Sequence, residues 1–272
     1  KEFYPEITRY FHFISMMPEL ISSANFSGGQ IQNNKDLPDF VLVDESFQSF
    51  REYKNDSRNA ILVLSRYDGD RGSSVVDLVD LNNWKTIHTY SVNLNDFQKL
   101  LGSTPLEDVE NFKLPAQNRA RIFHPIIGPN GELIADFHYS PLFKINLCSE
   151  LIWANFEKRF HHSHTFDGSG NIWVPTIKNT PKTDLHGVTE ATYRDEELTK
   201  VDADGKIIES RSLAEILLKN NVVGEGLLRS GIDPLHTNDI EEALYDTPFW
   251  KSGDLFISIK YLSAIIHYRP NQ

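Results

Sequence analysis

The sequence predicts an all-β protein built as a β-propeller, because one unit of short strands and turns recurs along the chain. Copies of the unit lie at 59–90, 121–154, 160–212 and 233–270. Each is close to the size of a four-stranded propeller blade, roughly 40–50 residues. Recurring Gly and Asp turns, with almost no long helix between them, favour a propeller over a β-sandwich. About four blades are visible in this way, with short helical inserts.

The clearest copy is 121–154, RIFHPIIGPNGELIADFHYSPLFKINLCSELIWA, which predicts four strands. Its turn GPNGE joins two apolar runs, as a hairpin turn containing Gly does. The stretch 160–177 repeats the opening of this copy, with a histidine, the turn DGSGN and an apolar strand. The stretch 196–212 supplies its later strands. The copy at 233–270 also opens with a histidine, and 59–90 shows mainly the later strands.

Three regions interrupt the repeat. Residues 1–50 are irregular and include candidate short helices, and 91–118 form a polar insert with a short helix. Residues 209–230 carry an amphipathic helix, since their apolar residues recur at helical spacing. We expect this helix to pack over one end of the propeller, and a lid is the alternative. The predicted helical face begins with Leu213, Ile216 and Leu217.

The predicted organisation has two parts. Residues 1–58 form an irregular N-terminal segment or a partial blade, and 59–272 form the propeller blades, incomplete at the C-terminus. The chain starts at Lys1 without a signal-peptide pattern, so a targeting segment was removed or never included.

Composition excludes several classes of function. A net charge of −11 argues against nucleic acid as a partner, because phosphate binding needs clustered Lys and Arg. No apolar run reaches about 20 residues, so we expect no membrane span. Cys148 is the only cysteine, which excludes an intramolecular disulfide and fits the cytosol or a secreted protein with a large core.

Histidines recur at one position of the repeat. Alignment of the copies places His124, His162 and His236 at the start of the first strand, before its Gly turn. The first strand of each blade lines the central channel of a propeller, so equivalent positions converge at one end. We therefore expect these three imidazoles to surround one polar pocket.

A second register adds cations to this pocket. Arg66, His138 and Lys260 each follow the first apolar run of their copy. A pocket with imidazoles and cations suits an anion or the transfer of an anionic group. His161 and His164 flank His162, and which of the three faces the pocket stays open.

Two other interpretations compete. A single histidine near a strand end is more often structural than catalytic, and repeats also duplicate structural residues. Three histidines could also bind zinc. We favour anion chemistry and expect no metal, because no Asp, Glu or Cys falls at short ligand spacing and a nearby Lys or Arg would repel the ion.

Two stretches resemble the bacterial arylsulfotransferase family. Residues 161–174 contain HH, a short polar stretch and DGSGNIWV, and this pattern resembles a blade opening of that family. LHTNDIEEA followed by GDLFISIKYLSAII resembles its second signature, in which His-x-Asn-Ser-Ile precedes a strand ending Ser-Arg-x-x-Ser-Ala-Ile. The resemblance implies a six-bladed propeller, a periplasmic or secreted location, and sulfuryl transfer between phenols with neither a nucleotide donor nor a cofactor.

The same resemblance implies roles for individual residues. His236 falls on the nucleophile that becomes sulfated, and Asn238 on the residue that orients the site. His162 matches an upstream active-site histidine, and Lys260 stands where the family has a sulfate-binding arginine. The substrate-binding candidates are His161, His164, His124, His138 and Arg66.

The chain departs from the family pattern at three points. Lys260 keeps the positive charge of the arginine but loses its bidentate fork. Ser163 stands where members often have Asp, and a further family histidine after the SAII strand has no counterpart before Gln272.

The expected reaction is a ping-pong transfer through a sulfohistidine, from an aryl sulfate donor to a phenolic acceptor. The alternative is a non-catalytic propeller that binds an anion or a protein partner, since fold alone does not imply activity. Oligomeric state stays open, with a homo-oligomer as one alternative.

Overall fold

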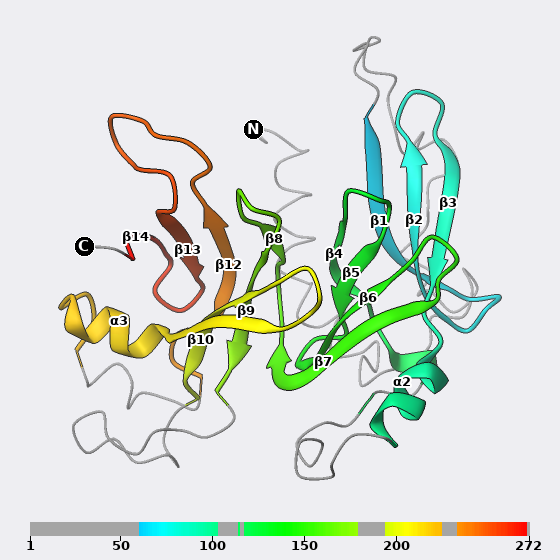
Figure 1. The fold of residues 1–272 in the computed structure, drawn as a ribbon, viewed down its shortest axis with the longest axis horizontal. Coiled ribbons are helices and arrows are strands. Elements are labelled where there is room, and N and C mark those ends of the chain that lie inside the picture. The colour runs from blue at the N-terminus through cyan, green and yellow to red at the C-terminus, as the bar shows by residue number, and fades with distance from the viewer. Residues whose placement is uncertain (1–59, 103–113, 115–116, 179–193, 225–232, 271–272) are drawn as a thin grey trace, which may run out of the picture. The chain divides into compact units, whose positions relative to one another are not determined.

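The computed structural model describes residues 60–102, 114, 117–178, 194–224 and 233–270. The N-terminal part predicted at 1–58 lies outside these residues. The chain divides into one unit of Lys1–Glu52 with Gly69–Gly72, and another of Tyr53–Asp68 with Ser73–Gln272. Every helix and strand described below belongs to the second unit. Antiparallel sheets dominate it, with few and short helices, which confirms the all-β class (Figure 1).

The first sheet is a three-stranded meander within the predicted copy at 59–90. Its strands pair antiparallel in the order β1-β2-β3, with Ile61 opposite Asp80 and Asp68 opposite Ser73. The strands are β1 (Ile61–Asp68), β2 (Ser73–Asp80) and β3 (Lys85–Ser91).

The predicted copy at 121–154 forms four antiparallel strands, as the sequence indicates. The turn after the first strand is closed by the Gly131 N–H, which donates to the Gly128 carbonyl at 3.0 Å. The φ of Gly131 is +81°, a conformation that glycine adopts readily. The strands are β4 (Phe123–Ile127), β5 (Leu133–Asp136), β6 (Ser140–Ile145) and β7 (Leu151–Phe160).

The next strands extend the same sheet. β7 pairs with β9 through Arg159 opposite Ile177 and Phe160 opposite Thr176. The sheet therefore runs β11-β10-β9-β7-β6-β5-β4, and the short β8 pairs with β9. The added strands are β8 (Thr165–Phe166), β9 (Ile172–Ile177), β10 (Glu196–Val201) and β11 (Ile207–Ser212).

A third sheet has the order β12-β13-β14. Hydrogen bonds tie it to the preceding strands: the Thr165 hydroxyl donates to the Ile240 carbonyl at 2.5 Å, and the Trp173 indole N–H donates to Glu242 at 2.7 Å. The closed arrangement of these sheets as propeller blades stays a prediction. The strands are β12 (Thr237–Glu242), β13 (Leu255–Ile259) and β14 (Ala264–Tyr268).

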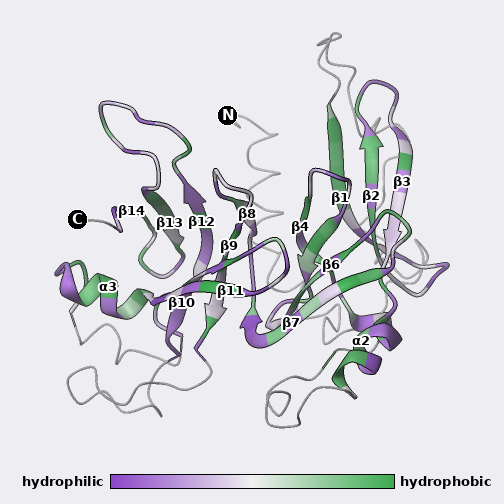
Figure 2. Cartoon of the chain, viewed as in Figure 1, coloured by the Kyte–Doolittle hydropathy of each residue, from purple (hydrophilic) through white to green (hydrophobic). Residues whose placement is uncertain are grey.

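Among the described residues, two α-helices and one 3₁₀ turn, η3 (Gln117–Arg119), accompany the sheets. The helix α2 (Leu94–Leu101) confirms the short helix predicted in the polar insert, and Asn93 caps its first turn. The helix α3 (Leu213–Lys219) is shorter than the predicted 209–230. The strand β11 continues to Ser212, whose side chain then caps the helix by accepting the Glu215 N–H. Figure 2 shows both hydrophobic and hydrophilic residues on each α-helix.

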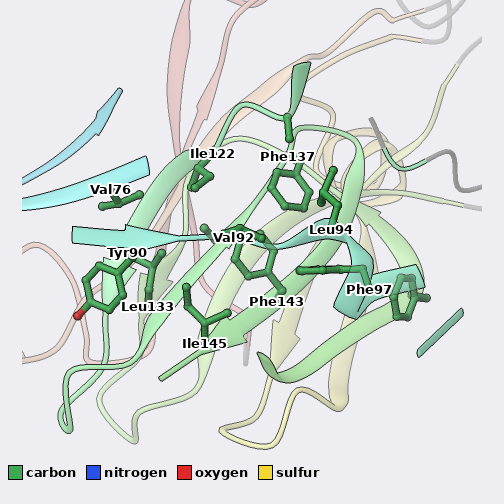
Figure 3. Close-up of a cluster of buried hydrophobic side chains, with 13 residues drawn as sticks. Val76, Tyr90, Val92, Leu94, Phe97, Ile122, Leu133, Phe137, Phe143 and Ile145 are labelled. Carbon is green, nitrogen blue, oxygen red and sulfur yellow. The ribbon is translucent and has the colours of Figure 1, made fainter. Parts of the chain in front are cut away.

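Buried hydrophobic clusters hold these elements together. In Figure 3 aromatic side chains such as Phe97, Phe137 and Phe143 lie among aliphatic ones from β2, β5 and β6. A second cluster joins α3 to β10, β12 and β13 through residues such as Leu217 and Leu235. The helix therefore packs against strands, and its predicted place over one end of a propeller stays a prediction. Among the described residues, no helix has the length and apolarity needed to cross a membrane.

Candidate active site

Four predicted site histidines share an unusual backbone conformation. The φ angles are 38° at His124, 65° at His138, 61° at His162 and 59° at His236. Residues other than glycine rarely adopt this left-handed region, and such strained positions concentrate at functional sites. The sequence placed His138 in a different register from the other three, yet its backbone conformation and contacts group it with them.

The four histidines lie where strands begin or end. His124 is in β4 at an irregularity of its pairing with β5, and His138 follows β5. His162 follows β7, and His236 immediately precedes β12. Each histidine is thus placed by the end or an irregularity of a strand, and of these strands β5 is buried along its whole length.

His162 and His236 form the centre of the site. Their Nε2 atoms lie 3.1 Å apart, and the Nδ1 of His236 lies 2.7 Å from the Asp233 carboxylate. A carboxylate accepts, so Nδ1 of His236 carries a proton and donates it. In the neutral imidazole, Nε2 of His236 then holds a lone pair, which accepts the Nε2–H of His162.

Further aromatic rings surround His162. The ring centroids of His138, His161 and His236 lie within 5.0 Å of it, each at a steep angle, and that of His124 lies at 6.4 Å. Burial, followed by the charges of the neighbouring histidines and Lys260, lowers the pKa of His162 to about 4. His162 is therefore neutral at physiological pH and offers an N–H donor without a positive charge.

His161 lies behind His162 and is fully buried. Neither of its ring nitrogens has a hydrogen-bond partner among the described residues, and its Nε2 lies 3.6 Å from Oε1 of Glu196. Burial holds the pKa of His161 well below its usual value, and burial also raises the pKa of Glu196 to about 7. The two side chains thus form a buried pair against the site, in which the imidazole is uncharged.

His164 supports the site and does not contact the central pair. It is buried, with Nδ1 2.8 Å from the His124 carbonyl and Nε2 3.1 Å from Asp136. Asp136 also accepts the backbone N–H of His138, at 2.5 Å. His164 therefore links the loop after β7 to the two turns that present His124 and His138.

Ser163 and Asn238 join the loop of His162 to the strand of His236. The backbone N–H and hydroxyl of Ser163 donate to the Asn238 carbonyl, at 3.3 and 3.1 Å, and its hydroxyl also donates to Asp239. The pairing of β12 with β13 is irregular between Thr237 and Asp239, which places Asn238 at a bulge. These contacts set the relative position of the two central histidines.

Lys260 lies beside the central pair. Its backbone N–H donates to the His236 carbonyl at 3.0 Å, and its exposed side chain places Nζ 5.0 Å from the ring of Tyr261. The Tyr261 ring is 5.5 Å from that of His236. A cation and an aromatic face therefore lie at the edge of the site.

Sequence reasoning missed Arg194, Tyr139, Asp233 and Glu196. The guanidinium of Arg194 lies 5.2 Å from the Tyr139 ring and 3.9 Å from Asp233. The Tyr139 ring in turn lies 5.0 Å from that of His161. The position of Asp233, three residues before His236, was the one signal available in the sequence.

The position of Arg66 differs from the prediction, which grouped it with His138 and Lys260 beside the pocket. It lies within β1 of the first sheet, where it pairs with Asp77 at 2.6 Å and Asp68 at 3.3 Å. In the described part of the chain these carboxylates are its ion-pair partners, and it contacts none of the histidines. The structure therefore does not bring Arg66 together with the other candidates.

A cavity of about 950 Å³ lies between α3, β11 and β14, and its lining includes none of the clustered histidines. Two of its cations are already paired, Lys178 with Asp195 and Arg269 with Asp254. Within the described residues, no group of three or more His, Cys, Asp or Glu side chains could hold a metal ion.

Taken together, the site offers one oriented imidazole lone pair, one neutral N–H donor beside it, and cations at its border. This set can attack an electrophile and stabilise oxygen atoms around it. Residues 126–272 match the model of a family described as arylsulfotransferase (ASST). No curated protein matches the chain.

Proposed function

Because the chain belongs to the arylsulfotransferase family, we propose that it transfers a sulfuryl group from an aryl sulfate to a phenolic acceptor. The family match supports a sulfotransferase in general. The route through a sulfohistidine on His236, the donor and the acceptor are our proposal. Antiparallel meanders support an arrangement of propeller blades, and we extend the proposal to that closed fold and to a periplasmic or secreted location.

The observation that carries the proposal is the orientation of His236. Asp233 holds Nδ1–H at 2.7 Å, which leaves the lone pair on Nε2, the atom that faces His162. An oriented base beside a carboxylate is the arrangement that activates nucleophilic side chains.

In the first half-reaction, Nε2 of His236 bonds to sulfur while the bond from sulfur to the aryl oxygen breaks. The phenolate leaves with that electron pair and takes a proton from solvent. The sulfated imidazole gains positive charge, which the Asp233 carboxylate at Nδ1 stabilises. The Nε2–H of His162 turns from His236 to a sulfuryl oxygen, with Lys260 as a second positive contact.

In the second half-reaction, an acceptor phenol that has lost its proton to solvent attacks sulfur, and the nitrogen–sulfur bond breaks. His236 returns to its neutral form, ready for another donor. Sulfuryl transfer resembles phosphoryl transfer in depending mainly on in-line positioning and charge stabilisation. The site needs no change in the protonation of His162 for either half.

The test is the intact mass of the protein after mixing with 4-nitrophenyl sulfate, together with release of nitrophenol. We expect the unsubstituted chain to gain one sulfuryl group, and His236→Ala to gain none. His267→Ala is the matched control, since His267 pairs with Asp254 outside the cluster and its loss should leave the mass gain intact.

An equal gain in His236→Ala would refute the proposed nucleophile. If neither protein gains mass or releases nitrophenol, while calorimetry shows that aryl sulfate binds, the anion-binding alternative replaces the transferase. The lysine at position 260, which lacks the arginine fork, is the feature that favours this alternative.

A further inference from the structure

Glu196 is a buried carboxyl group that the proposed reaction does not use. It lies at the start of β10, fully buried, while the next residue, Glu197, pairs with Lys158. The side chains of successive strand residues point to opposite faces, so Glu196 and Glu197 lie in different surroundings. A buried carboxyl group is costly unless it is hydrogen-bonded, which indicates that its contacts matter.

Both strong contacts of Glu196 are to Thr237. Its Oε2 accepts the backbone N–H of Thr237 at 2.5 Å and the hydroxyl at 2.6 Å. Thr237 directly follows His236, whose φ of 59° is strained. The two hydrogen bonds therefore fix the backbone at the first residue after the proposed nucleophile.

The other oxygen of Glu196 faces the second half of the site. Oε1 has no hydrogen-bond partner among the described residues, and it lies 3.6 Å from Nε2 of His161. The ring of His161 is 5.0 Å from that of His162. One carboxyl group thus touches the chain segments of both central histidines, which come from different sheets.

We propose that Glu196 is a positioning residue for the transfer reaction, acting through Thr237 to hold His236 against His162. The inference rests on the proposed function for its kinetic consequence only. Its structural content concerns the position of the His236 ring and can be tested without turnover.

The acceptor oxygen, and not the negative charge, carries this role. Because burial raises the pKa of Glu196 to about 7, the group is protonated over much of the neutral and acidic range and still accepts at Oε2. Glutamine presents the same acceptor through its amide oxygen, whereas leucine has the size but no acceptor.

The kinetic test compares Glu196→Gln, Glu196→Leu and Thr237→Val with 4-nitrophenyl sulfate as donor. We expect Glu196→Leu to lower kcat roughly 100-fold, because a displacement near 1 Å has this effect on reacting groups. The KM should change by less than about threefold, since donor binding is not altered. Glu196→Gln should keep kcat within about threefold, and Thr237→Val, which keeps the backbone N–H, should lose about 10-fold.

The spectroscopic test uses the ring ¹⁵N chemical shifts of His236 in histidine-labelled protein, assigned with His236→Ala. We expect Glu196→Leu and Thr237→Val to move these shifts. The control Glu197→Gln should leave both the shifts and kcat unchanged, since Glu197 bonds to Lys158 and not to Thr237.

The outcomes separate the two proposals. If the unsubstituted protein transfers no sulfuryl group but Glu196→Leu moves the His236 signals, the proposed function fails and the positioning role stands. If transfer occurs and folded Glu196→Leu keeps its kcat and signals, the positioning role fails and the function stands. A Glu196→Gln variant as impaired as Glu196→Leu would also overturn the positioning role. If Glu196→Leu does not fold, the result with Thr237→Val decides whether the role stands.

Discussion

The Nε2 atoms of His162 and His236 lie 3.1 Å apart, although the residues are 74 positions apart in the chain. Only one proton fits between two such nitrogens, so the contact defines a donor and an acceptor. Asp233 decides which is which, because it fixes the proton of His236 on Nδ1. The direction of this hydrogen bond supports our proposal that His236 is the nucleophile of the pair.

Replacement of Asp233 by asparagine should therefore impair transfer. The amide removes the negative charge that stabilises sulfated His236 and can present an N–H that favours the wrong tautomer. We expect kcat to fall about 100-fold with 4-nitrophenyl sulfate. Asp246→Asn is the control, since Asp246 pairs with Lys251 in the loop between β12 and β13. Equal kcat values for the two variants would contradict the assigned tautomer.

His162→Leu should separate binding from chemistry. The variant loses the N–H donor beside the reacting nitrogen, an interaction that strengthens as charge develops on the sulfuryl oxygens. We expect kcat to fall about 100-fold while KM changes little. Steady-state kinetics with two donors of different leaving groups would check this, and a change confined to KM would show that His162 only binds the substrate.

Glu196 should make stability depend on pH. Its folded pKa of about 7 lies above the ordinary value of 4.5 for a glutamate, so the folded protein holds a proton that the unfolded chain has released. The contribution of Glu196 to stability is complete below pH 4.5 and is lost as pH rises towards 7. Urea unfolding gives the free energies of unfolding of the unsubstituted protein and of Glu196→Gln. As pH rises across this window, the difference between these two free energies should shift in favour of the variant. A constant difference would argue against the raised pKa.

The depressed pKa of His162 acts in the opposite sense. The unfolded chain binds the proton more readily between the ordinary histidine pKa of 6.5 and the folded pKa of about 4. The folded protein should thus lose stability relative to His162→Gln as pH falls from 6.5 to 4. The same unfolding series measures this effect, and parallel curves for the two proteins would refute it.

The core in Figure 3 predicts a large effect of truncation. Phe143 is fully buried and packs against Phe97 and Phe137, with ring centroids 5.2 and 4.8 Å away. We expect Phe143→Ala to lower the free energy of unfolding by about 3–5 kcal/mol. Ile265→Ala, at a position 72% exposed, should stay within about 0.5 kcal/mol, and a similar loss in both would contradict the assigned core.

The strands and the central histidine pair were accessible from the sequence because both repeat. Alternating apolar residues and Gly turns recur in each copy, so His162 and His236 could be aligned without a structure. His138 was placed in another register, because its turn conformation leaves no mark on the spacing of residues. Arg66 was misplaced for a related reason: β1 continues past it to Asp68, and local carboxylates pair with its side chain.

The supporting residues could not be predicted in the same way. Glu196 and Arg194 reach the site from β10 or just before it, and strand alternation alone does not distinguish Glu196 from Glu197. Their roles depend on packing between distant segments, which no local pattern encodes. The start of α3 was likewise predicted too early, because β11 continues to Ser212 before the helix begins at Leu213.

Four histidines in left-handed backbone have a consequence for engineering. Each such position is strained by about 1 kcal/mol or more, and glycine would relieve much of that strain. A search for thermostable variants, made without regard to activity, should therefore select glycine or asparagine at 124, 138, 162 or 236. Substitutions that gain stability at these positions would remove the imidazoles. Screens should therefore keep the four histidines unchanged and seek stabilising substitutions in the buried cores.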